Sequence, residues 1–218
     1  MKNLLFLLLF STPFVTFSQW TFSYNLEAPN KKHELPTILN EISGLTDVDS
    51  THIACVQDEL GIVFIYNFNT GEIISQHRFD SIGDFEGLTY TPNALYILRS
   101  DGQLTEWNNF RTKNSSVKQY KLSLVTSNNE GLCFDSKNNR LLIAAKSKPI
   151  DHDVKSERFI YAFNLKTKKL DAKPIYSLNV DELSKRALQF GIQQTDTTSK
   201  GVLKPFNFRP ASLAVHPL

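Results

Sequence analysis

Short runs of apolar and β-branched residues, separated by polar turns, follow one another along most of the chain. Each run has the length of a β-strand, and turn-forming pairs such as Asp101-Gly102 lie between runs. The runs fall into three groups: 53–57, 62–67 and 73–79; 95–99, 103–107 and 117–122; and 141–145, 159–164 and 175–178. This pattern predicts an all-β fold.

A six-residue phrase stands in front of each group, at 41–46, 84–89 and 128–133. Its centre reads Ser-Gly-Leu in the first copy and Glu-Gly-Leu in the other two, and the copies begin 43 and 44 residues apart. If the phrase is itself a strand, each unit holds four strands. Four strands in roughly 40–45 residues are typical of one blade of a β-propeller.

The units divide the chain into blades at about 36–82, 83–126 and 127–180. A fourth copy of the phrase begins at Arg209, within 208–218, after an insert at about 181–207 whose first residues have helical spacing. We therefore expect three four-stranded blades plus the first strand of a fourth. Propellers close with at least four blades, so this one is expected to be incomplete.

The first residues resemble a signal peptide: Lys2 is followed by the apolar run 4–10, a break at 11–13 and small residues at Thr16 and Ser18. We expect cleavage after residue 18, which leaves 19–218 as a mature chain that is periplasmic or secreted. The apolar run is too short for a membrane span, and no later segment is long and apolar enough for one. The mature chain is therefore expected to have no stable transmembrane span.

Charge and cysteine content narrow the class further. The chain has 24 Lys and Arg against 22 Asp and Glu, a net charge of +2, which gives no electrostatic case for nucleic acid as a partner. Cys55 and Cys133 lie in apolar runs well apart in the repeat. Two buried free thiols are the favoured interpretation, although export would permit a disulfide.

The Ser-Gly-Leu and Glu-Gly-Leu series, the phrases at 84–89 and 129–134 and the later 209–217 segment resemble the SdiA-regulated family, also called YjiK-like. The resemblance covers about 36–218. It implies an exported bacterial β-propeller of about six blades, of which this chain would be the amino-terminal two thirds. It also implies a link to calcium, which some relatives bind or respond to.

Glu86 and Glu130 hold the same place in successive units, and Asp84 and Asn128 lie two residues earlier. Side chains two apart on a strand share a face, so the four would converge at one end of the inner strands. Oxygen ligands of this kind suit calcium, and we take Glu86 and Glu130 as metal ligands and Asp84 and Asn128 as ligand-binding. The alternative is that the two glutamates accept backbone hydrogen bonds and only lock the repeat together.

Arg99 ends the second strand of the second unit and is a weaker ligand-binding candidate, able to reach an anion or to pair with Glu86. A solvated side chain or an ion pair is the more ordinary outcome for such a residue. Nothing in the sequence has the spacing of a catalytic motif.

The leading hypothesis is a non-catalytic exported propeller that binds a ligand or protein partner, with calcium as the candidate ion, in an envelope stress or signalling role that only the resemblance suggests. The alternative is a calcium-dependent hydrolase of the phytase-like or lactonase-like kind. A third hypothesis is a purely structural scaffold. The identity of the ligand or partner is open.

Overall fold

A computed structural model describes residues 28–29, 31–150, 156–192, 197–202 and 207–216. The predicted signal peptide, 1–18, lies outside these residues. The chain divides into two units, Met1–Lys32 and His33–Leu218.

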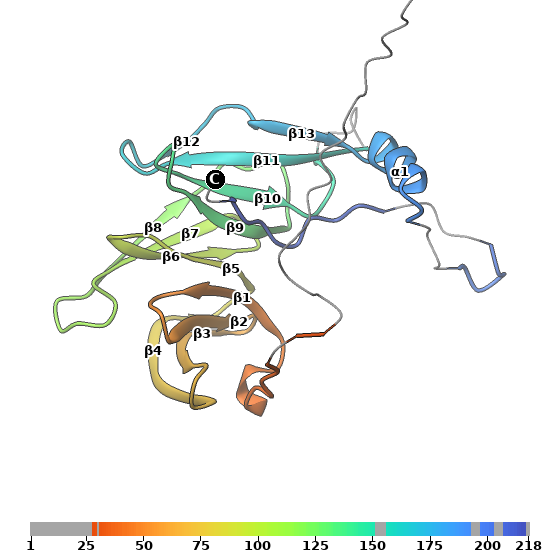
Figure 1. Cartoon of the computed structure of the whole chain (residues 1–218). Coiled ribbons are helices and arrows are strands. Elements are labelled where there is room, and N and C mark those ends of the chain that lie inside the picture. The colour runs from red at the N-terminus through yellow and green to blue at the C-terminus, as the bar shows by residue number, and fades with distance from the viewer. Residues whose placement is uncertain (1–27, 30, 151–155, 193–196, 203–206, 217–218) are drawn as a thin grey trace, which may run out of the picture. The chain divides into compact units, whose positions relative to one another are not determined.

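The first two sheets are four-stranded, antiparallel and built in chain order (Figure 1). A short 3-10 turn, η1 (Thr37–Leu39), precedes the first sheet. The first sheet consists of β1 (Ile42–Asp47), β2 (His52–Gln57), β3 (Leu60–Asn67) and β4 (Glu72–Ile82). The second consists of β5 (Phe85–Tyr90), β6 (Ala94–Arg99), β7 (Gln103–Asn108) and β8 (Ser116–Lys121).

The third sheet has the same antiparallel order, except that two strands share its fourth position. It is made of β9 (Asn129–Asp135), β10 (Arg140–Ala145), β11 (Glu157–Asn164), β12 (Lys169–Leu170) and β13 (Tyr176–Asn179). The last two strands both pair with β11, so they divide the fourth position between them. Each predicted strand run of the sequence therefore falls on an observed strand.

Burial follows the order of strands within a sheet. The second and third strands hold most of the buried residues, whereas β4 alternates between half-buried and exposed residues and β8 is nearly all exposed. Consecutive sheets share their cores: one apolar cluster joins the first sheet to the second, and another joins the second to the third. The fourth position of each sheet thus forms one edge, and the first strands of consecutive sheets contact each other.

The Gly-Leu pair of the repeat makes this packing close. A Cβ added at Gly44 would lie 2.8 Å from the Leu88 nitrogen, and one added at Gly87 would lie 2.7 Å from the Leu132 Cβ. Gly131 would meet the Leu213 side chain at 3.1 Å. Each glycine therefore receives the leucine region of the next unit, and any side chain there would push the sheets apart.

The segment 207–216 is where expectation and structure differ. Leu213 contacts Gly131 as the repeat predicts, and it packs on the apolar cluster of the third sheet. However, 207–216 forms no strand, so the predicted first strand of a fourth unit is wrong for the described residues. Pro210 lacks an N–H group, which removes one donor from any ladder with β9.

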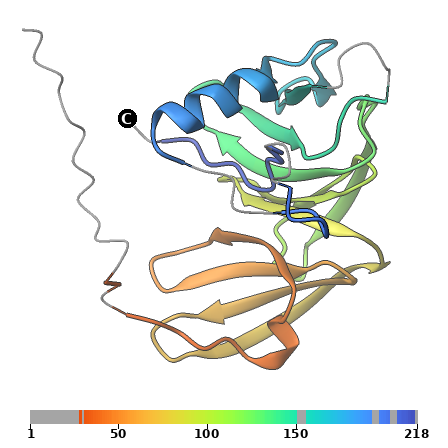
Figure 2. The ribbon, with the colours of Figure 1, turned by 90° about the vertical axis from the view of Figure 1, so that its right-hand side faces the viewer.

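The insert begins with α1 (Val180–Gln189), where the sequence predicted a helix (Figure 2). Asn179 caps it by accepting hydrogen bonds from the Asp181 and Glu182 amides. None of the helices in the described part of the chain has the length and apolar character to cross a membrane. Cys55 and Cys133 are free and buried, as predicted.

Candidate functional site

A β-bulge lies at the same place in the first strand of every sheet. The register with the second strand shifts between Ile42 and Gly44, between Phe85 and Gly87, and between Asn129 and Gly131. The extra residues are Ser43, Glu86 and Glu130. A bulge leaves its extra residue out of the ladder and re-aims its side chain, which breaks the simple two-residue alternation assumed from the sequence.

Asp84 and Asn128 come just before their strands instead of within them. We use the name bulge cluster for Asp84, Glu86, Ser100, Asn128, Glu130 and Lys146. Its members come from two consecutive sheets, whose first strands β5 and β9 are neighbours.

Glu86 is a half-buried member of the bulge cluster, and its pKa is raised far above the ordinary value of a glutamate. Burial, then the negative charges of Glu130 and Asp84, raise the pKa of Glu86 to about 7, while the positive charge of Lys146 opposes them. A hydrogen bond to Asp84 raises it further. Glu86 is therefore partly protonated near neutral pH.

Glu130 is more deeply buried, and its charge is matched. The Lys146 ammonium donates to Glu130 Oε1, and both side chains lie largely away from solvent. Lys146 follows the last residue of β10, and its amide donates to the Asn128 carbonyl at 3.0 Å. Sequence reasoning missed Lys146 because it is 16 residues from its partner and outside any repeated phrase.

The two residues ahead of the strands have different surroundings. The Ser100 hydroxyl donates to Asp84 Oδ2, and the Ser100 amide donates to the Asp84 carbonyl at 2.8 Å. The side-chain oxygen of Asn128 is buried and has no hydrogen-bond partner in the described part of the molecule. An unsatisfied buried acceptor is costly, so Asn128 offers a place for a donor or a cation.

The equivalent site of the first sheet is already satisfied. The Ser43 hydroxyl donates to the Phe85 carbonyl at 2.5 Å, which joins the first sheet to the second. Here the bulged residue acts as the structural lock that the sequence left open as an alternative.

Arg99 does not pair with Glu86. Its guanidinium forms a two-point ion pair with Asp101, at 3.0 Å from Nε to Oδ1 and 2.9 Å from Nη2 to Oδ2. Lys121 joins the same carboxylate at 2.8 Å. The proposed reach to Glu86 is therefore corrected: the residue belongs to a surface ion pair within its own sheet, next to the β6–β7 turn.

Among the residues that the structure describes, no three His, Cys, Asp or Glu side chains are grouped so that they could hold a metal. Carboxyl oxygens of Asp84, Glu86 and Glu130 and the amide oxygen of Asn128 are nonetheless donors of the type that calcium prefers. The bulge cluster therefore has suitable donor chemistry, and other oxygen atoms must complete any metal shell there.

The fold consists of three consecutive antiparallel sheets, each with strands at four positions, and it contains little helix. This arrangement is consistent with a propeller-like protein. A family model described as SdiA-regulated matches residues 16–195. The chain belongs to the SdiA-regulated family.

A search of curated proteins gives no match. Among solved structures, the computationally designed Ika4 protein is 15% identical with a TM-score of 0.44, over 68% of this chain and 81% of that one. A glutaminyl cyclase of Myxococcus xanthus is 17% identical with a TM-score of 0.44, over 64% of this chain and 51% of that one. Likeness at this level carries no argument about activity.

Proposed function

We propose that this chain is an exported, non-catalytic β-propeller protein whose bulge cluster binds a ligand through a cationic group, with calcium as the first candidate. Family membership and the signal-type amino terminus support export and the propeller. The observation that carries the binding site is Glu86, a half-buried carboxyl group whose pKa is raised to about 7 and whose neighbours include two further acidic residues.

A bound cation would favour the ionised form of Glu86, which burial and the neighbouring negative charges now oppose. When a cation binds, Glu86 would release its proton to solvent, and the cation would then compensate the negative charges of Glu86 and its acidic neighbours. Glu86 and Glu130 would hold calcium, with Asp84 and Asn128 beside them. The ion would add positive charge to a site in which Lys146, paired with Glu130, is the one cationic member of the bulge cluster.

Thermal unfolding with calcium or with chelator tests the proposal. A ligand that binds only the folded protein stabilises it by about 2.7 kcal/mol at a concentration 100 times its Kd. We expect calcium to raise the melting temperature of the unmutated chain, and the double substitution Glu86→Gln and Glu130→Gln to remove the rise.

Glu72→Gln is the matched control, because Glu72 is an exposed residue of β4 away from the cluster. It should retain the full response to calcium. Equal melting temperatures of the unmutated chain with calcium and with chelator would contradict calcium binding. A calcium effect that survives the double substitution would place the ion elsewhere.

A further inference from the structure

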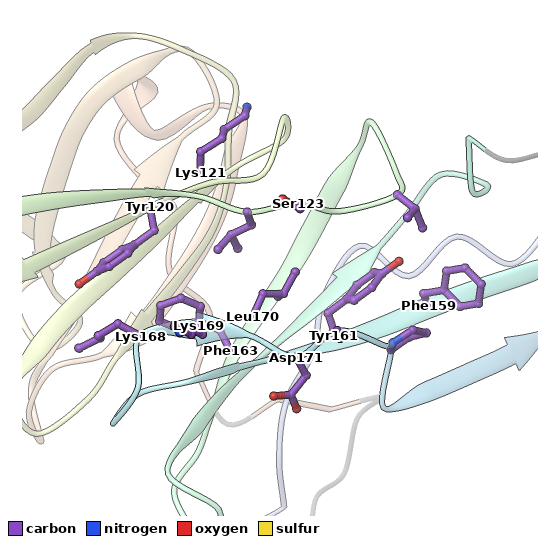
Figure 3. Close-up of a pocket in the computed structure, with 14 residues that line it drawn as sticks. Tyr120, Lys121, Ser123, Phe159, Tyr161, Phe163, Lys168, Lys169, Leu170 and Asp171 are labelled. Carbon is purple, nitrogen blue, oxygen red and sulfur yellow. The ribbon is translucent and has the colours of Figure 1, made fainter.

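A cavity of about 530 Å³ opens between the second and third sheets (Figure 3), and no residue of the bulge cluster lines it. Its walls come from the end of β8 and the loop that follows it, from β11 and from the β12 region. Small-molecule sites in proteins commonly have volumes of about 300–1,000 Å³. The cavity is thus large enough for a compound of a dozen or so heavy atoms.

The cavity exists because the outer position of the third sheet is interrupted. β4 and β8 are continuous, whereas β12 ends at Leu170 and β13 begins at Tyr176. Asp171 and Ile175 still donate to β11, each at 2.8 Å, but the residues between them leave the ladder. Pro174, which has no N–H to donate, is one of them and lines the cavity.

Aromatic side chains form one part of the wall. Phe159, Tyr161 and Phe163 come from β11, and Tyr120 packs against Phe163 with ring centroids 5.4 Å apart. Rings arranged in this way offer offset or edge-to-face partners to another ring. The apolar part of the cavity therefore suits a flat ring.

A buried hydroxyl group also belongs to this wall. Tyr161 is only 3% exposed, and its hydroxyl lies beside the Val125 backbone amide but makes no hydrogen bond of normal geometry within the described residues. Burial raises the pKa of Tyr161, so the group stays protonated and can donate. The Val125 amide can only donate to this oxygen, so the hydroxyl hydrogen remains able to donate to a polar atom of a ligand.

Two residues of opposite charge are among those that line the cavity. Lys169 and Asp171 are exposed, and neither has an ion-pair partner in the described part of the chain. The other two lysines of the wall are already paired, Lys121 with Asp101 and Lys168 with the buried Glu106. One cation and one anion thus remain available beside an aromatic wall.

We propose that this cavity binds a small zwitterion with an apolar ring, the chemistry of a free aromatic amino acid. The ligand carboxylate would pair with Lys169, its ammonium group with Asp171, and its ring would lie against Phe159 and Tyr161. Charge-assisted contacts of this kind add orientation to the apolar contact. The site is independent of the bulge cluster, so it holds or fails separately from the function proposed above.

Calorimetric titration with three matched probes tests the proposal: L-phenylalanine, its amide, which lacks the carboxylate, and 3-phenylpropionate, which lacks the ammonium group. We expect saturable one-to-one binding of phenylalanine and at least tenfold weaker binding of the other two. Lys169→Gln should abolish the preference over the amide, and Asp171→Asn the preference over 3-phenylpropionate. Phe159→Ala should weaken all binding.

Lys166→Gln is the matched control, because Lys166 lies in the same β11–β12 turn but does not line the cavity. It should bind phenylalanine as the unmutated chain does. The substituted Lys169 and Asp171 are exposed, so both variants are expected to fold. Absence of saturable phenylalanine binding, equal binding of all three probes, or binding unchanged by both charge substitutions would each overturn the proposal.

Discussion

The interface between the first and second sheets and the interface between the second and third share one backbone design but differ in chemistry. Both place a bulge beside the glycine that receives the next unit. In the first sheet the bulged residue is Ser43, a neutral side chain that donates across the interface at 2.5 Å. In the second it is Glu86, whose charge is opposed by burial and by two acidic neighbours.

The difference distinguishes the residues that pack the sheets together from the side chains that could bind a ligand. The bulge and the glycine are needed wherever two sheets meet, so by themselves they indicate packing. The side chain on the bulge is free to vary, and only in the second and third sheets does it bring acidic groups together. Substitutions that affect both interfaces alike should therefore report on folding, and those that affect only Glu86 and Glu130 on binding.

The largest effect is expected from Gly87→Val. A Cβ at this position would lie 2.7 Å from the Leu132 Cβ and 2.8 Å from the Glu130 carbonyl oxygen, which cannot move without separating the sheets. We expect a loss of about 3 kcal/mol or more in the free energy of unfolding. Gly191→Ala is the control: its φ of 74° adds backbone strain of about 1 kcal/mol, but no atom lies within 4 Å. Urea unfolding measures both variants. An equal loss of free energy of unfolding in Gly87→Val and Gly191→Ala would contradict close packing at the repeat glycine.

The leucine that follows the glycine gives a smaller and graded effect. Leu88 is 3% exposed, whereas Leu45, at the same place in the first sheet, is 57% exposed. Leu88→Ala should cost about 2–4 kcal/mol and Leu45→Ala less than about 0.5 kcal/mol. A cost for Leu45→Ala comparable with that for Leu88→Ala would mean that another surface covers the first sheet in solution.

Repetition is the reason why so much of the architecture could be predicted from the sequence. The recurring six-residue phrase predicted the length of each unit, and the polar turns predicted where the strands begin and end. The Gly-Leu register extended correctly to Leu213, although 207–216 forms no strand. Hydrophobic periodicity reports which residues are buried, and it does not report whether a backbone pairs with its neighbour.

The candidate site was less predictable. The position of Glu86 and Glu130 on neighbouring first strands follows from the repeat, but a bulge has no hydrophobic signature. The partner of Glu130, Lys146, lies in a connection whose path depends on the whole sheet. Arg99 forms an ion pair with Asp101, two residues away, which is the ordinary outcome that the sequence favoured over a contact with Glu86.

The pH dependence of stability gives a third and smaller effect. Glu86 has a pKa raised from 4.5 to about 7 in the folded chain, so the folded state binds more protons than the unfolded state between these values. Stability contributed by protonated Glu86 is therefore present below pH 4.5 and is lost as the pH rises toward 7. With allowance for solvent screening, the loss is about 1–2 kcal/mol.

Glu86→Gln should remove this loss, and the two proteins should differ most above pH 7. Urea unfolding at pH 5 and pH 8 measures how the free energy of unfolding of each protein changes with pH. Identical pH dependence in the two proteins would mean that Glu86 titrates normally.

A carbon-13 NMR titration of the Glu86 side-chain carboxyl group, with and without calcium, shows whether Glu86 belongs to a proton-linked cation site. We predict a pKa near 7 without calcium, because burial and the Glu130 and Asp84 charges oppose ionisation. We predict a fall of at least one pH unit with calcium bound, because a cation favours the charged form. A pKa near 4.5, or a raised pKa that calcium does not change, would contradict a proton-linked cation site at Glu86.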